Sequence, residues 1–297
     1  MTLIDMFQYG FIQRALIAGS LIAVLCAVLG VFLVLRRLSL IGDGLAHVTF
    51  GSVALALFAN VPPLAVTLAA IPLVMLSSLG ILKLMERAKI FGDAAVGIVA
   101  SLGIAVGVLL AGLSGGFSVD LFSYLFGNIL SVSREEVILA AILFVLIIAA
   151  VSLYYYELLA VTFDEELART SGINTGRVNT LLVLLTSLIV VLAMKVAGIM
   201  LVSSLIVLPA VTALQIATGF RTALFLAAAC ALLSVVGGII ASFALNIPAG
   251  ATIILLNFSL FLCAFLGRRF VRSEGGVSQL SVRAAISRRA QKLKHWK

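Results

Sequence analysis

The chain has 297 residues, of which 63% are hydrophobic and 11% charged, and its 20 Lys and Arg against 12 Asp and Glu give a net charge of +8. Soluble domains are about one-quarter charged, so this composition excludes a soluble protein and indicates an integral membrane protein. Apolar stretches of about 20 residues recur along nearly the whole length, which excludes a single anchor on a soluble domain.

The apolar stretches predict an all-α, polytopic bundle, because only helices satisfy their own backbone groups inside a bilayer. We predict about nine spans, at 12–35, 42–59, 63–83, 93–113, 136–156, 177–196, 198–217, 221–245 and 249–267. The seventh contains Pro209 and is the one expected to be broken or re-entrant, which would leave eight.

Basic residues set the expected orientation. With the amino terminus outside, every Lys and Arg except Arg14, Arg134 and Lys195 falls on the cytoplasmic side, as the positive-inside rule requires. The positive charge therefore orients the chain in a membrane and does not indicate nucleic acid. Residues 1–270 form the transmembrane domain, and 271–297 form a basic cytoplasmic tail that is expected to touch anionic membrane lipid.

In chain order, the first residues that carry chemistry are Asp43 and His47, at the start of the second span. A spacing of four places both side chains on one helix face, roughly 6 Å apart at Cβ. Ionisable groups at membrane depth indicate a substrate pathway, and carboxylate with imidazole suits zinc or manganese. A hydrogen-bonded packing histidine is the alternative that the spacing alone leaves open.

Three further residues are candidates for the pore or its gate. Asp93 opens the fourth span, Asn128 lies in the polar, interrupted segment 115–133, and Pro209 lies within the seventh span. For Asp93, a helix-start carboxylate is an equally ordinary role, and for Pro209 a simple kink is.

The connection at about 157–177 is predicted to hold a short exposed helix on the cytoplasmic side. Thr162 and Glu165 have the spacing of a capping box, and Gly172 suits the end of the helix. Phe163 and Leu167 share one face of this helix, which gives a small apolar surface that a cytoplasmic partner could contact. A plain amphipathic connector fits the same pattern.

The segment 166–172 (Glu-Leu-Ala-Arg-Thr-Ser-Gly) resembles the Glu-Ala-Ala…Gly loop by which ABC importer permeases dock onto their ATPase, with Leu167 in place of the middle Ala. Together with the segments 36–47, 125–130 and 198–210, it makes residues 10–270 resemble the zinc/manganese-type ABC permease family. The resemblance implies an ABC importer permease fold, Asp43 and His47 as the metal pair, and a docking loop that includes Glu165, Glu166, Ala168 and Gly172.

The same resemblance implies a homodimeric, occasionally heterodimeric, pore in the bacterial cell membrane. Its partners would be two cytoplasmic ATPase subunits and an extracellular metal-binding lipoprotein, and its cargo zinc or manganese, with iron as a further candidate. No cofactor is expected to be bound permanently. The sequence contains no Gly-x-x-x-x-Gly-Lys-Ser/Thr loop, so ATP would be bound and hydrolysed by the partner subunit, and the chain is not expected to be an enzyme.

Two other functions share part of this pattern. A secondary, proton-coupled carrier could use an Asp–His relay without an ATPase. An ABC permease for a bulky chelate such as a siderophore or cobalamin would share the docking loop but would have no need of the Asp43–His47 pair.

Overall fold

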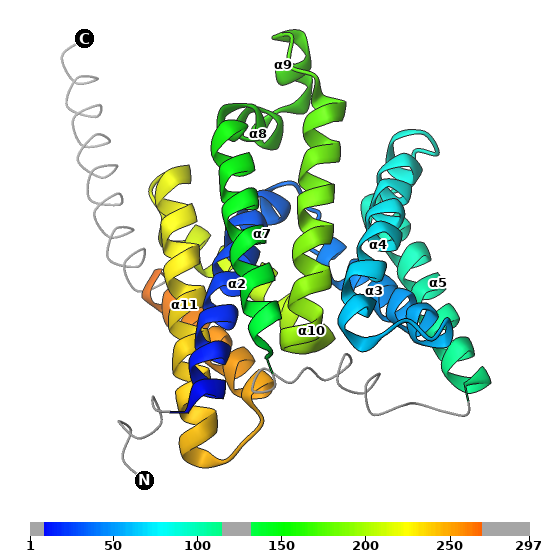
Figure 1. Cartoon of the computed structure of the whole chain (residues 1–297). Coiled ribbons are helices and arrows are strands. Elements are labelled where there is room, and N and C mark those ends of the chain that lie inside the picture. The colour runs from blue at the N-terminus through cyan, green and yellow to red at the C-terminus, as the bar shows by residue number, and fades with distance from the viewer. Residues whose placement is uncertain (1–8, 115–131, 269–297) are drawn as a thin grey trace, which may run out of the picture.

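A computed structural model of the chain describes residues 9–114 and 132–268, which form helices and short connections without any strand (Figure 1). The helices are α2 (Gly10–Leu35), α3 (Ile41–Phe58), α4 (Pro63–Glu86), α5 (Gly92–Leu113), α7 (Arg134–Leu153), α8 (Tyr155–Phe163), α9 (Glu165–Thr170), α10 (Thr175–Ile216), α11 (Phe220–Leu245) and a last helix, Ala249–Arg268. Within the described ranges, eight helices are long and apolar enough to cross a membrane. The predicted all-helical, polytopic fold is confirmed.

α10 contains two of the predicted spans, because it folds back at Gly198. This residue has φ 78° and ψ 166°, a conformation open essentially only to glycine. Near the start of α10, Asn179 accepts a hydrogen bond from Arg36, and just after its end the ring of Phe220 packs against Phe32, 5.1 Å between centroids. A straight helix of 42 residues would be about 63 Å long and could not bring both ends to the same turn of α2.

The break predicted in the seventh span therefore lies at its border, at Gly198, and the helix continues through Pro209. Pro209 is buried, and no other residue of α10 leaves the helical conformation. Proline is tolerated within membrane helices where neighbouring groups satisfy the freed carbonyl.

The bundle has two distinct ends. α8 and α9 lie together at one end, which we call the α9 end (Figure 1). At the opposite end, the start of α7 is fixed by an ion pair between Glu136 and Lys195 and by a hydrogen bond of 2.8 Å from Arg14 Nε to the Val132 carbonyl. Lys195, one of the three basic residues outside the expected cytoplasmic set, is thus paired with a carboxylate.

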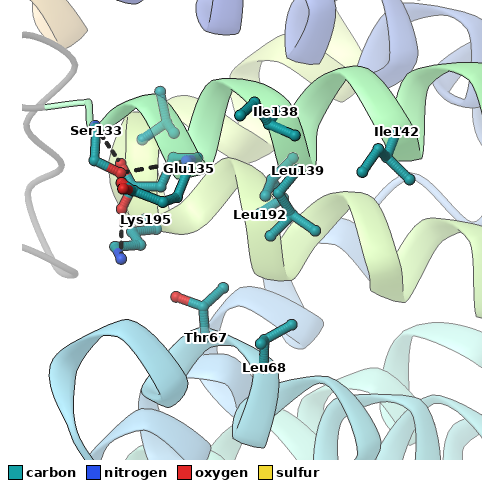
Figure 2. Close-up of a pocket in the computed structure, with 11 residues that line it drawn as sticks. Thr67, Leu68, Ser133, Glu135, Ile138, Leu139, Ile142, Leu192 and Lys195 are labelled. Atoms are coloured by element: carbon teal, nitrogen blue, oxygen red, sulfur yellow. Dashed lines mark hydrogen bonds and ion pairs between the residues drawn. The ribbon is translucent and has the colours of Figure 1, made fainter.

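A cavity of about 330 Å³ opens beside this ion pair, between α4, α7 and α10. Thr67 and Leu68 of α4 face Leu139 and Leu192 across it (Figure 2). Its walls are mostly apolar, and the polar groups gather at the Lys195 side.

Candidate functional site

Asp43 and His47 lie one turn apart on α3 and face each other, as predicted from their spacing. His47 Nε2 is 3.6 Å from Asp43 Oδ2, and the two side chains are 27% and 47% exposed, respectively. Asp43 lies in the first turn of α3, where the helix dipole favours a negative charge. The pair is thus reachable and has a carboxylate oxygen and an imidazole nitrogen on the same side of one helix.

Close helix packing fixes the backbone that carries the pair. A Cβ atom on Gly103 of α5 would lie 2.7 Å from Val48 Cα and 2.8 Å from the His47 carbonyl oxygen. Only glycine permits this approach, which is typical of small residues at membrane helix interfaces. α5 therefore holds α3 at the position of His47.

A third residue, Ser203, belongs to this site and was not singled out from the sequence. Its hydroxyl donates a hydrogen bond of 2.9 Å to Asp43 Oδ1 from the second half of α10. One carboxylate oxygen is thereby fixed by Ser203, and the other faces His47. No pattern in the sequence indicates this contact, because a serine in a membrane helix ordinarily bonds to a carbonyl of its own helix.

The pair is not joined by a third ligand within the described residues, where no group of three His, Cys, Asp or Glu side chains could hold a metal ion together. Asp93 is exposed in the first turn of α5 and does not join the pair. Pro209 is buried within α10, and Asn128 lies outside the described residues. The geometry of the pair supplies two ligands, which is half of a tetrahedral site.

The expected short helix on the 157–177 connection is present as α9, but its predicted cap is wrong. The cap is Asp164, whose Oδ1 accepts a hydrogen bond of 2.9 Å from the Leu167 amide. Thr162 still belongs to α8, and its hydroxyl donates to the Leu158 carbonyl. Asp164 is preferred because α8 continues to Phe163, which leaves Asp164 as the only extended residue between two helices. Gly172, with φ 88°, follows the helix end as predicted.

The prediction that Phe163 and Leu167 share one face of a single helix is wrong, because Phe163 ends α8, Leu167 belongs to α9, and the extended Asp164 separates the two helices. Both side chains are nevertheless exposed. Phe163 and Leu167 are 65% and 64% exposed, whereas Ala168 is buried against the bundle. Phe163 also packs its ring on Phe220, the first residue of α11, with 5.9 Å between centroids. This contact holds the Phe163 ring in place.

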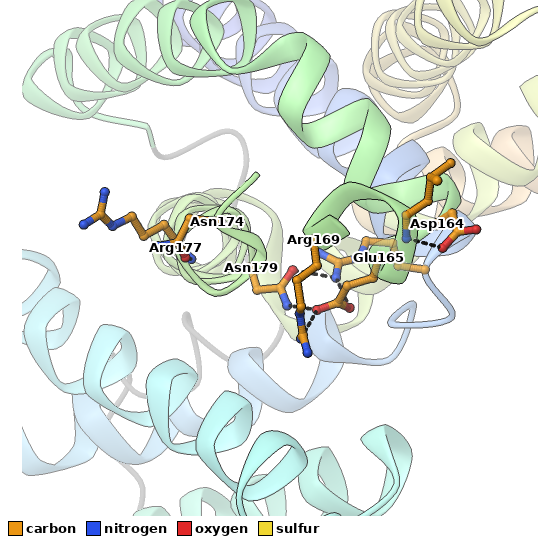
Figure 3. A network of polar contacts seen from close by, with 8 residues as sticks. Asp164, Glu165, Arg169, Asn174, Arg177 and Asn179 are labelled. Carbon is orange, nitrogen blue, oxygen red and sulfur yellow. Dashed lines mark hydrogen bonds and ion pairs between the residues drawn. The ribbon is translucent and has the colours of Figure 1, made fainter. Parts of the chain in front are cut away.

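Glu165 points the other way, into the bundle (Figure 3). Its Oε1 accepts a hydrogen bond of 3.1 Å from Asn179 Nδ2, and its Oε2 lies 3.5 Å from Arg36 Nη2. Burial lowers the pKa of the Arg36 guanidinium and the Glu165 carboxylate raises it, the first effect being the larger. The docking residues implied by the resemblance are therefore divided between an exposed and an inward face.

Comparisons with known proteins identify the family of this chain. Residues 8–268 match the ABC 3 transport family. The chain is 34% identical to the manganese transport system membrane protein MntC of Halalkalibacterium halodurans over 263 residues, 88% of each chain. It is 30% identical to the high-affinity zinc uptake system membrane protein ZnuB of Haemophilus influenzae, over 86% of this chain and 96% of that one.

The chain belongs to the ABC 3 transport family. Among solved structures, it is similar to a chain of PsaBC from Streptococcus pneumoniae in complex with Fab, with a TM-score of 0.80 and 30% identity over 92% of this chain and 98% of the other. As a member of the ABC 3 family, the chain is an integral protein of the cell membrane and a transport permease. The secondary-carrier alternative is thereby wrong.

Proposed function

We propose that this chain is the permease subunit of an ATP-driven importer of divalent transition-metal ions, with manganese or zinc as cargo and iron as a further candidate. The observation that carries the proposal is the partly buried Asp43–His47 pair on a membrane helix of an ABC 3 chain. Burying ionisable groups at membrane depth is costly, so such a pair has a function in the pathway.

The ligand chemistry fits a borderline cation. Imidazole and carboxylate together suit zinc or manganese, whereas calcium and magnesium favour more oxygen ligands. A second copy of the chain, related by a two-fold axis, would add another Asp43 and His47 and complete four ligands. Without thiolates, such a site would bind an ion loosely enough to release it.

The energy for transport would come from separate ATPase subunits bound at the α9 end, which we place on the cytoplasmic side. The exposed surface of Phe163, Glu166 and Leu167 is the contact that we propose, with Ala168 and Gly172 shaping the helix behind it. A metal-binding lipoprotein would deliver the cargo at the opposite end. The remaining alternative, a permease for a chelate or cobalamin, is disfavoured because relatives named for manganese and zinc cover nearly the whole chain.

Asp43→Ala and His47→Ala are expected to abolish metal uptake, because each removes half of the protomer's ligands. His47→Gln should be nearly as harmful, since an amide keeps the polarity but is a poor ligand for a transition metal. The measurement is uptake of radiolabelled manganese and zinc by cells that express each variant at the wild-type level. Co-purification of the ATPase serves as the control for folding. Normal uptake by the variants would contradict the metal site.

A further inference from the structure

Three residues that are far apart in the sequence meet in a polar cluster at the α9 end, which we call the Arg36 clamp. Arg36 lies between α2 and α3, Glu165 opens α9, and Asn179 lies in the first turns of α10. Arg36 Nη2 donates to Asn179 Oδ1 at 2.6 Å and lies 3.5 Å from Glu165 Oε2, and Asn179 Nδ2 donates to Glu165 Oε1 at 3.1 Å. Each residue contacts both of the others.

Burial makes Arg36 dependent on its partners. The Arg36 side chain is only 11% exposed and Asn179 is buried, whereas Glu165 is 40% exposed and also lies 3.9 Å from Arg169 Nη2. A guanidinium withdrawn from water is stable only with a charged or hydrogen-bonded partner, and removing one member of such a pair leaves an uncompensated charge. Glu165 is the carboxylate that compensates this charge. Movement of α9 away from Arg36 therefore costs free energy, because it leaves the guanidinium without its charged partner.

Arg36 is also close in the chain to the metal pair. It follows the last residue of α2, and α3 begins at Ile41, two residues before Asp43. The connection is tightly folded, because the amides of Arg37 and Leu38 donate to the Val34 and Leu33 carbonyls and Arg37 has a φ of 59°. A displacement of Arg36 would therefore also displace the first residues of α3.

We propose that Glu165 acts inside the permease, not on the ATPase: through Arg36 and Asn179 it is a positioning residue that couples movement of α9 to the Asp43–His47 helix. This inference rests on the proposed function. In this proposal Phe163 at the end of α8, with Glu166 and Leu167 of α9, contacts the ATPase, while Glu165 transmits the movement. Interfaces with two discrete packings can convert a small shift at one site into a change at another.

The first test compares two neighbouring glutamates in the purified permease–ATPase complex reconstituted into liposomes. Glu165→Gln should keep the ATPase bound but lower the metal transported per ATP hydrolysed by about tenfold. Glu166→Lys, on the exposed face, should instead weaken co-purification of the ATPase. The double variant Arg36→Glu with Glu165→Arg again pairs opposite charges at these two positions. It should recover part of the metal transported per ATP hydrolysed, and a variant that had lost its fold could not show this recovery.

The second test does not depend on the cargo. Leu40 is exposed between Arg36 and α3, so Leu40→Cys, in a chain whose Cys26, Cys230 and Cys263 are replaced by Ser, reports on this connection. ATP with vanadate should change the rate of maleimide labelling at position 40 in the complex, and Glu165→Gln should remove that change. Glu86→Gln, at the exposed end of α4 and outside the proposed ATPase contact, is the control and should retain it.

Two results would overturn the clamp: loss of ATPase binding by Glu165→Gln to the same extent as by Glu166→Lys, or an unchanged response at position 40 in Glu165→Gln. Failure of the wild-type complex to transport manganese or zinc would contradict the proposed cargo instead. The labelling response would then still decide the role of Glu165.

Discussion

At the scale of single residues, the proposed metal pair Asp43–His47 depends on a group that orients it. Asp43 accepts from Ser203 through one oxygen and faces His47 through the other. Groups that hydrogen-bond to a metal-binding carboxylate fix its orientation and typically change metal affinity when they are removed. Ser203 therefore belongs to the site although a serine hydroxyl is a poor ligand for these metals.

Ser203→Ala is expected to weaken binding of manganese or zinc to the purified permease by about 10–100-fold. Ser203→Thr keeps the hydroxyl and should retain most of the affinity. The adjacent Ser204 is the matched control, because its buried hydroxyl has no hydrogen-bond partner within the described residues. Ser204→Ala should bind metal as the wild type does, and isothermal titration calorimetry measures all three. Equal affinities for Ser203→Ala and Ser204→Ala would remove Ser203 from the site.

At the scale of elements, the turn of α10 at Gly198 positions both the clamp and the metal pair. The first half of α10 carries Asn179, and the second half carries Ser203. Both contacts require the helix to reverse between them. A single backbone conformation at Gly198 therefore connects the α9 end of the molecule to the orientation of Asp43.

Gly198→Ala is expected to destabilise the permease by about 1–3 kcal/mol, because a Cβ atom is strained at φ 78° and ψ 166°. The thermal unfolding midpoint in detergent should fall by several degrees. Gly112→Ala in α5 is a suitable control, since that glycine is helical and a Cβ there would meet no atom within 4 Å. An unchanged midpoint for Gly198→Ala would mean that the turn is not fixed by this residue.

At the scale of the whole molecule, the arrangement of the ends predicts which residues face the cytoplasm. Ser171 follows α9, and Ile247 follows α11, which starts at the α9 end and runs to the opposite one. The distribution of Lys and Arg places the α9 end on the cytoplasmic side.

In a cysteine-free background, Ser171→Cys should resist a membrane-impermeant thiol reagent in intact cells and react after permeabilisation. Ile247→Cys should react in intact cells. The reverse pattern would invert the orientation and, with it, the proposed positions of the ATPase and the lipoprotein.

The sequence by itself determined the helical class, the approximate spans, and the Asp43–His47 pair. Hydrophobicity sets the length of a membrane helix, and helical periodicity sets which residues three or four apart share a face. For the same reason, the short helix at 165–170 and its end at Gly172 could be predicted, since both depend on local backbone chemistry. The choice of cap could not, because it depends on how far the preceding helix α8 continues.

Only the tertiary structure decided which distant groups meet. Ser203 lies 160 positions from Asp43, and Asn179 lies 143 positions from Arg36, so no local pattern connects them. Glu165 and Glu166 are equivalent in the sequence, yet one is turned inward by a buried arginine that only the packing of α2, α9 and α10 brings beside it. The reversal of α10 at Gly198 makes these contacts possible, because it places the two halves of the helix side by side. Hydrophobicity predicts that two apolar segments are present but not how they lie relative to each other.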